Sequence, residues 1–155
     1  ACDAERAYVG QFGNELLAAS LADGSILWRT GDKGAPIFST PALAPGRVVV
    51  GARDMSVSCF NSEDGVRIWR FATRGDVDSS PIILKDTVVF GADDGRVYAV
   101  TLAEGRETWS YEIGQPIKSS PAFAGGLLVI GADDGGVYAF GAAVAESPHS
   151  AKPAP

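Results

Sequence analysis

Short apolar runs separated by glycine-containing turns are the dominant pattern along this chain. Residues 48–50, 88–90 and 127–130 are apolar at consecutive positions. A strand with one face in water alternates apolar and polar residues, so consecutive apolar residues predict strands covered on both faces. An amphipathic helix spaces its apolar residues three and four apart and contains few glycines. The pattern therefore predicts an all-β fold in which small sheets stack face to face.

Several marker residues recur with one common period. Pro81 follows Pro41 by 40 positions, and Trp69 follows Trp28 by 41. A glycine stands four positions before each tryptophan, and another glycine ends each apolar run. The full sets are Pro41, Pro81 and Pro121; Trp28, Trp69 and Trp109; Gly24, Gly65 and Gly105; and Gly10, Gly51, Gly91 and Gly131. Independent markers that share a period predict a repeat protein, and we expect these residues to be structural anchors of the repeat.

One repeat contains four short segments with strand character. Residues 81–84, 87–91, 96–102 and 107–112 are rich in apolar and β-branched residues and are separated by turn residues. The proline stands at the start of the first segment, where its missing N–H does least harm to strand pairing. A period of about 40 residues with four strands is typical of a propeller blade. The sequence therefore predicts an all-β β-propeller of four-stranded blades, with about three and a half blades in residues 1–141.

The turn residues predict the kind of hairpin within each blade. Asp94-Gly95 and Asp134-Gly135 favour two-residue type I′ turns, because both central residues need a positive φ. Gly13-Asn14 is a fair substitute. The second repeat has Asp54-Met55 at this place. Methionine is disfavoured at positive φ, so we expect a wider or different turn there.

Aligned on tryptophan, the repeats resemble a known motif. Residues 99–109 resemble the tryptophan-docking motif of pyrroloquinoline-quinone-type (PQQ-like) β-propellers, Ala-x-Asp-x-x-x-Gly-x-x-x-Trp, and residues 18–28 and 59–69 have the same frame. Ser20, Asn61 and Thr101 replace the Asp of the motif. The resemblance covers residues 7–141. It implies that the tryptophans pack between neighbouring blades, so all three are expected in the core rather than as platforms for a ligand.

The same resemblance separates two functional branches. Quinone-dependent dehydrogenases of the family use an adjacent cysteine pair, a catalytic Asp and a bound calcium, whereas Cys2 and Cys59 are 57 positions apart here. The chain is more similar to the non-catalytic, BamB-like branch of outer-membrane assembly factors. This implies a scaffold with no catalytic, cofactor-binding or metal-binding residues that binds protein partners in the periplasm or the extracellular envelope. Two alternatives stay open: the C-terminal part of a PQQ-dependent dehydrogenase, and the sensor domain of a bacterial membrane kinase.

Composition narrows the function classes further. The net charge is −6 and no cluster of Lys or Arg offsets it, which argues against nucleic-acid binding. The apolar runs are too short for a transmembrane segment. His149 is the single histidine and falls in residues 142–155, an Ala/Pro-rich tail that we expect to be disordered. The repeats therefore lack the commonest general base. Cys59 is expected to be a buried free thiol; lipidation at Cys2 would need a leader that the sequence does not contain.

Three segments that connect the blades are the expected binding sites for a protein partner. They are residues 30–37, 73–78 and 113–118, since propeller loops vary while the blade frame stays constant. The acidic turns 93–95 and 133–135 lack the alternating carboxylates of a calcium loop and are interpreted as hairpin turns. Residues 74–76 spell an Arg-Gly-Asp adhesion tripeptide, which we attribute to chance.

The repeats do not add up to a closed ring. The chain begins within a blade at residues 7–10 and ends after residues 137–140 without a fourth strand or a tryptophan. Open edges invite self-association. Three explanations remain: a fragment of a seven- or eight-bladed protein that could carry a membrane anchor, a head-to-tail dimer that completes a ring, or a small four-bladed ring. The fragment is favoured, because the first residues look cut from inside a repeat.

Overall fold

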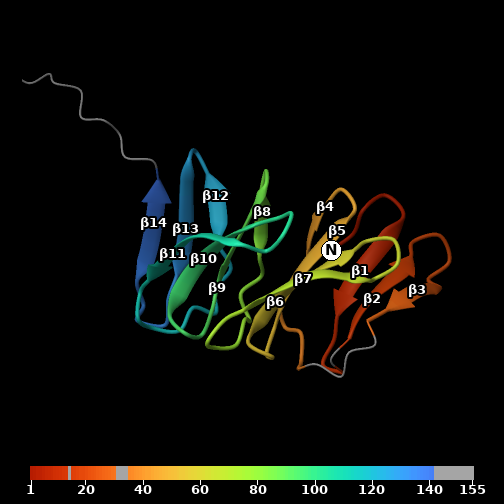
Figure 1. Cartoon of the computed structure of the whole chain (residues 1–155), viewed down its shortest axis with the longest axis horizontal. Helices are drawn as coiled ribbons and strands as arrows, with labels where there is room; N and C mark the ends of the chain where they lie inside the picture. The colour runs from red at the N-terminus through yellow and green to blue at the C-terminus, as the bar shows by residue number, and fades with distance from the viewer. Residues whose placement is uncertain (14, 31–34, 142–155) are drawn as a thin grey trace, which may run out of the picture.

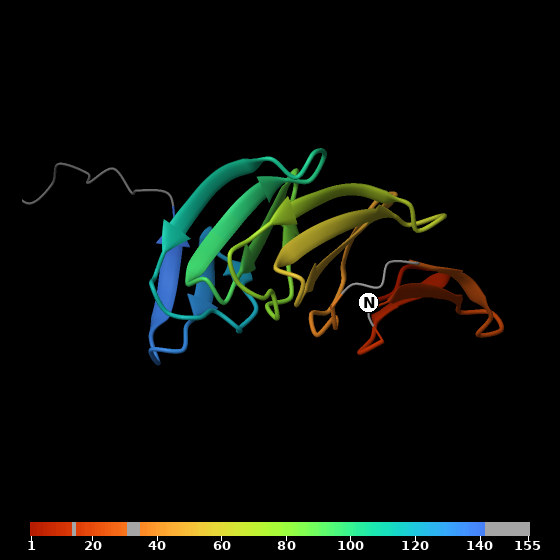
Figure 2. The ribbon, with the colours of Figure 1, turned by 60° about the horizontal axis from the view of Figure 1, so that its bottom comes forward.

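Four antiparallel sheets stand side by side along an arc in the computed structural model (Figure 1, Figure 2). The structure describes residues 1–13, 15–30 and 35–141. The expected tail, residues 142–155, lies outside the described residues, as do Asn14 and part of the first connecting segment. The sheets contain three, four, four and three strands, which confirms the predicted all-β propeller arc of about three and a half blades.

The strands follow one another through each sheet in sequence order, from the inner strand to the outer one. Their bounds are β1 (Arg6–Gly10), β2 (Leu16–Ser20) and β3 (Ile26–Arg29); β4 (Ala42–Ala44), β5 (Arg47–Ala52), β6 (Ser56–Asn61) and β7 (Arg67–Ala72); β8 (Ile82–Leu84), β9 (Thr87–Gly91), β10 (Arg96–Thr101) and β11 (Glu107–Glu112); β12 (Ala122–Ala124), β13 (Leu127–Gly131) and β14 (Val137–Gly141).

Residues 1–3 occupy the innermost position of the first sheet. Cys2 forms an antiparallel bridge with Ala7, and the Tyr8 N–H donates to the Ala1 carbonyl at 2.8 Å. Strands β4, β8 and β12 hold this position in the other sheets. The first repeat therefore enters its sheet at residue 1, not within a blade at residues 7–10 as the sequence suggested.

The hairpins between the second and third strands differ from the expected type I′ turns. The turn of the third blade spans residues 93–95, with the Gly95 N–H donating to the Ala92 carbonyl at 3.1 Å. Gly95 has a φ of +82°, whereas Asp94 is not at positive φ. This is a three-residue turn that needs positive φ only at its last position. Met55 takes that position in the second blade with a φ of +57°. The turn there is wider than a type I′ turn, as expected, but it has the same length as the turn of the third blade, and methionine adopts the positive φ that was expected to exclude it.

Side chains of adjacent sheets interlock to form the core. In β5, Val48 and Val50 pack toward the first sheet, whereas Val49 packs toward the third. Both faces of this strand are covered, as its apolar run predicted. In β13 only Leu128 and Ile130 are buried against the third sheet. The apolar run 127–130 therefore has one uncovered face, which differs from the expectation.

Repeated glycines let the chain cross from one blade to the next. A Cβ atom at Gly51 would lie 2.5 Å from a methyl group of Val77, and Gly91 meets Ile117 in the same way. A serine clamps each crossing: the Ser39 hydroxyl accepts the Gly51 N–H at 2.9 Å and donates to the Gly51 carbonyl at 2.8 Å. The same serine–glycine pairing is found at residues 79 and 91 and at residues 119 and 131. Pro41, Pro81 and Pro121 are buried directly before β4, β8 and β12.

Each buried tryptophan packs on the turn of the following blade. The Trp69 indole N–H donates to the Leu102 carbonyl at 2.8 Å. A Cβ atom at Gly105 would lie 2.6 Å from that indole, so only glycine leaves room for it. Gly105 also has a φ of +68°, which favours glycine for a second reason. Trp28 packs in the same way on the turn of Gly65.

Trp109 is the exception among the three tryptophans. Its exposed fraction is 39%, against 8% for Trp28 and for Trp69. Its ring packs edge-on to Phe140 at 5.2 Å between centroids and stacks on Tyr111. The expectation that all three tryptophans lie in the core was therefore wrong for Trp109.

We expect Trp69→Ala to lower the free energy of unfolding by about 3–5 kcal/mol, because it empties a large buried site between two blades. Ile68→Ala is the control, since Ile68 is an exposed neighbour on the same strand and its truncation should cost about 1 kcal/mol or less. Urea unfolding followed by circular dichroism measures both. Equal losses would contradict the packing role of Trp69.

We expect Gly65→Ala to destabilise the protein more than Gly46→Ala, by about 1–3 kcal/mol. Both glycines have nearly the same positive φ, +72° and +71°, so the backbone strain of alanine is common to both. Only at Gly65 does the added methyl group meet the Trp28 ring; nothing lies within 4 Å at Gly46. The difference in unfolding free energy isolates the cost of pushing the indole away.

Candidate functional site: the connector face

The loops of the propeller divide between two sides of the arc, because successive antiparallel strands reverse direction. The turns at residues 53–55, 93–95 and 133–135 and the connecting segments at residues 73–78 and 113–118 share one side, the lower one in Figure 1. We call this side the connector face. It contains the described parts of all three segments expected to bind a partner; residues 31–34 of the first segment lie outside the described residues.

Two aromatic side chains project from the connector face between the first two blades. Phe12 lies in the first hairpin turn and Phe38 directly follows the first connecting segment (residues 30–37), with exposed fractions of 74% and 41%. Their rings meet edge-to-face with centroids 4.7 Å apart. The pair is thus held in place by its own contact while most of its apolar area remains in water. Exposed aromatic clusters of this kind are typical of protein-binding surfaces.

Arg53 extends this aromatic pair toward the next blade. Its guanidinium lies 3.8 Å from the centroid of the Phe38 ring. It also donates two hydrogen bonds to the Asp78 carboxylate, at 2.8 Å and 2.7 Å. The bond to Asp78 raises the pKa of Arg53 above its usual value, although burial opposes the effect. Arg53 is therefore fixed from two sides, while 41% of its side chain remains exposed.

Over the third and fourth blades, the connector face carries carboxylates. Burial raises the pKa of Asp93, and the nearby Lys118 ammonium partly offsets the shift. Oδ1 of Asp93 is buried and has no hydrogen-bond partner among the described residues. Lys118 itself pairs with Asp133 at 3.0 Å. The connector face therefore changes from aromatic and cationic over the first blades to largely acidic over the later ones.

In the acidic turns 93–95 and 133–135, the second aspartate accepts hydrogen bonds from its own hairpin. Asp94 accepts the Arg96 N–H at 3.1 Å and the Tyr98 hydroxyl at 2.6 Å. The bond to Asp94 and burial together raise the pKa of Tyr98, burial having the larger effect. Asp134 repeats these bonds with Gly136 and Tyr138. These aspartates thus stabilise the hairpins, and no group of three His, Cys, Asp or Glu within the described ranges is placed to hold a metal ion.

The Arg-Gly-Asp tripeptide and the two cysteines, which the sequence also singled out, lie in the following surroundings. Arg74-Gly75-Asp76 lies along the turn of the third blade, and a Cβ atom at Gly75 would lie 2.5 Å from the backbone nitrogen of Asp94. Cys59 is a buried free thiol, as expected, and burial raises its pKa, whereas Cys2 is exposed. The described residues contain no helix that is long and apolar enough to cross a membrane.

Comparison with known proteins settles the family. The family model for the outer membrane protein assembly factor BamB matches residues 1–143. The chain belongs to the BamB family. The crystal structure of BamB from Moraxella catarrhalis superposes with a TM-score of 0.77 at 18% identity, covering 91% of this chain and 43% of that one. The chain thus spans less than half the length of that BamB. A computationally designed protein, Ika4, gives a TM-score of 0.81 at 18% identity, covering 90% of this chain and 87% of that one. A search of curated proteins found no match.

Sequence reasoning did not find Phe12, Phe38 and Arg53 in this BamB-family chain. The signal was present in the aligned repeats, where the first turn residue is Phe12, Arg53, Asp93 or Asp133. Phe38, Asp78 and Lys118 likewise share one position of the repeat, directly before the clamping serine. Residues that vary in character while the surrounding frame repeats point to surface positions released from the demands of the fold.

Replacement of Asp93 should change the pH dependence of stability. A folded-state pKa above that of the unfolded chain means that stability falls as the pH rises through this pKa. We expect Asp93→Asn to raise the free energy of unfolding at pH 7 and to have little effect at about pH 3, where the carboxyl is protonated in both states. Urea unfolding at the two pH values tests this. Asp133→Asn, which removes only an exposed pair with Lys118, should show no gain; a loss of stability in Asp93→Asn at pH 7 would contradict the prediction.

Proposed function

We propose that this chain is a non-catalytic part of a BamB-type propeller that binds a protein partner through the connector face. The observation that supports the proposal most directly is the cluster of Phe12, Phe38 and Arg53. It combines exposed aromatic area with a cation whose position is already fixed. Binding to such a cluster removes apolar surface from water and loses little side-chain entropy, because the cluster is ordered before the partner arrives.

The chemistry of the connector face indicates the kind of partner. An apolar side chain fits against Phe12 and Phe38, and a backbone carbonyl or carboxylate fits the free edge of Arg53. Further along the face, Asp93 and Asp133 favour basic groups or backbone N–H groups. The partner we expect is therefore a protein segment with an apolar residue at one end and basic residues at the other. Electrostatic matching of this kind mainly sets orientation and association rate.

The family name suggests where the partner is found. The matching family consists of outer membrane protein assembly factors, so we propose a bacterial envelope location and a partner from outer-membrane protein assembly. This part of the proposal rests on the family relationship, whereas the binding surface rests on the geometry above.

Two alternative functions make different predictions for a longer protein that contains this chain. A PQQ-dependent dehydrogenase would reduce a redox dye with alcohol or sugar substrates once quinone and calcium are added. A kinase sensor domain would be preceded by a kinase and a membrane span in the same gene. Our proposal predicts neither dye reduction nor a kinase.

The proposal is tested by placing a photo-crosslinking amino acid at Phe12 and identifying the proteins captured in envelope extracts. Once a partner is purified, we expect Phe38→Ala to weaken its binding by at least about 30-fold, the effect of losing a central aromatic contact. Val66→Ala is the matched control, since Val66 is equally apolar and 61% exposed but lies on the opposite side of the blade. Equal binding by both variants would reject the connector face as the binding site.

A further inference from the structure

The joint between the first two blades lacks the aromatic rings that fill the next joint. Between the second and third blades, the rings of Phe71, Phe90 and Tyr98 meet with centroids 5.4 to 6.0 Å apart. All three belong to the core of that joint. The equivalent positions one repeat earlier hold the small residues Thr30, Val50 and Ser58.

These three small residues line a cavity of about 40 Å³ between the first two blades. The wall also includes Ile37, Ala52 and Asp54. One water-sized atom needs about 10–15 Å³, so about three non-hydrogen atoms fit in the cavity and an aromatic ring does not. Size therefore restricts the occupant to a very small group.

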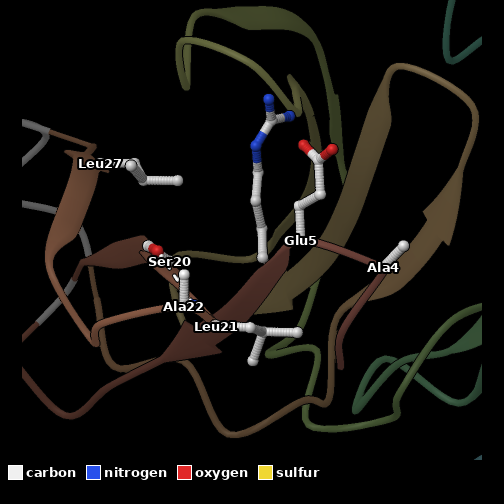
Figure 3. A pocket seen from close by; sticks show the side chains of 7 residues that line it. Ala4, Glu5, Ser20, Leu21, Ala22 and Leu27 are labelled. Atoms are coloured by element: carbon white, nitrogen blue, oxygen red, sulfur yellow. Dashed lines mark hydrogen bonds between the residues drawn. The ribbon is translucent and has the colours of Figure 1, made fainter.

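This cavity differs from the wider one shown in Figure 3. The cavity of Figure 3 has about 570 Å³, and its described lining residues all fall within residues 4–27 of the first blade. Leu21 and Leu27 on its wall are 53% and 48% exposed. The cavity between the blades has walls from both of them, so it can surround a small group on several sides.

The small cavity opens on the connector face and ends inside the joint. Ala35 and Ile37 of the first connecting segment are half-buried, as is Ala52 next to the turn at residues 53–55. Val50 and Ser58 are buried. A side chain that enters from the connector face therefore reaches Ser58.

The mouth of the cavity adjoins the cluster proposed to bind a partner. Ile37 directly precedes Phe38 in the chain, and Asp54 directly follows Arg53. Phe38 and Arg53 contact each other above this part of the joint, with the guanidinium 3.8 Å from the ring centroid. A partner segment that covers both side chains therefore passes close to the mouth.

Two polar groups on the cavity wall can form a further hydrogen bond. Ser58 is only 8% exposed, and its hydroxyl has no hydrogen-bond partner among the described residues. A buried hydroxyl without a partner is unfavourable, so a group that bonds to it is stabilised there. Asp54 accepts one bond at each carboxylate oxygen, from Ser56 at 2.5 Å and from Arg70 at 3.1 Å. A carboxylate can accept about four.

The third blade shows which group suits this carboxylate. Asp94 holds the position of Asp54 in the repeat and accepts the Tyr98 hydroxyl at 2.6 Å. Because Ser58 stands at the position of Tyr98, the second blade keeps the carboxylate but lacks that hydroxyl. An occupant with its own hydroxyl group restores the bond. The cavity therefore favours a small group that has one hydroxyl and a few apolar carbons.

We propose that this cavity holds a threonine side chain of the protein segment that binds the connector face. A threonine side chain has three non-hydrogen atoms, one of them a hydroxyl oxygen, so it matches both the size and the polar groups of the cavity. The hydroxyl donates to Asp54 and accepts from Ser58, while the methyl group contacts Val50. This inference rests on the proposed function, because the threonine belongs to the same partner.

Ethanol, the free analogue of the threonine side chain, tests the cavity without a partner. We expect saturable amide NMR shifts at Val50 and Ser58 of the full chain, with a dissociation constant between about 1 and 100 mM, because three non-hydrogen atoms contribute little binding energy. Acetonitrile is as small but has no hydroxyl, and tert-butanol has the hydroxyl but is larger. Both should bind at least about 10-fold more weakly. Shifts that grow linearly with ethanol, or equal binding of the three compounds, would overturn the proposal.

Ser58→Val removes the unpartnered hydroxyl and fills the cavity, and valine is well tolerated in a strand. We expect this variant to lose saturable ethanol binding. Val50→Ile, which adds one carbon to the same cavity, should weaken it at least about 5-fold. Ser110→Val is the control, since Ser110 lies on β11 of the third blade and bonds to Glu107 at 2.8 Å. Circular dichroism verifies that each variant is folded. Unchanged ethanol binding by a folded Ser58→Val or Val50→Ile would contradict the proposal.

The partner captured by crosslinking at Phe12 provides the second test. We expect its crosslinked segment to contain a threonine, and Ser58→Val to weaken its binding at least about 10-fold. If Phe38→Ala weakens binding and Ser58→Val does not, the threonine site is rejected while the connector face stands. If neither variant changes binding, the connector face is rejected and the threonine site with it. A crosslinked segment without a threonine would also overturn the proposal.

Discussion

The packing of an indole on a glycine that lacks a Cβ atom is the interaction on which this arc depends. The glycine must have a positive φ to close the four-residue turn between the third and fourth strands, and it must also leave room for the ring of the preceding blade. One residue thus satisfies a conformational demand of its own blade and a steric demand of its neighbour. The indole N–H then donates to a carbonyl of the same turn, which fixes the angle between the sheets as well as their distance.

The inner side of the arc uses a different device for the same purpose. The chain crosses between blades over Gly51 and Gly91, where Val77 and Ile117 take the space of a side chain. Serines clamp these glycines, and the N–H of Thr40 reaches across to the Ser80 hydroxyl of the next blade at 2.8 Å. The joints are polar near the axis and aromatic at the rim. Because both kinds recur with the period of the sequence, each blade is positioned by its neighbours alone.

The features that repeat could be predicted from the sequence, because a residue that recurs in every blade is required by the fold and a residue found in one blade is not. The period, the tryptophans and the turn glycines follow directly from the spacing. The turn type did not follow from Asp-Gly alone, since the third turn residue takes the positive φ and even Met55 adopts it when the strands on both sides are held. Trp109 is exposed because no glycine turn packs on it among the described residues. The contact of Arg53 with Phe38 and Asp78 joins three segments whose proximity only the folded structure reveals.

The alternation of antiparallel strands keeps assembly and recognition apart. The turns of Gly24, Gly65 and Gly105 and the hairpins at residues 45–46 and 85–86 lie on one side, while the connector face lies on the other. A neighbour that covers Leu27 or Leu127 packs against the face of a sheet and leaves Phe12 and Phe38 in solvent. The arc can therefore be extended at its ends without loss of the surface proposed for partner binding. Each end sheet already buries one face against its own chain. A neighbour therefore adds apolar contact to a sheet that is already formed. Partners that are ordered before they meet lose little conformational entropy when they associate.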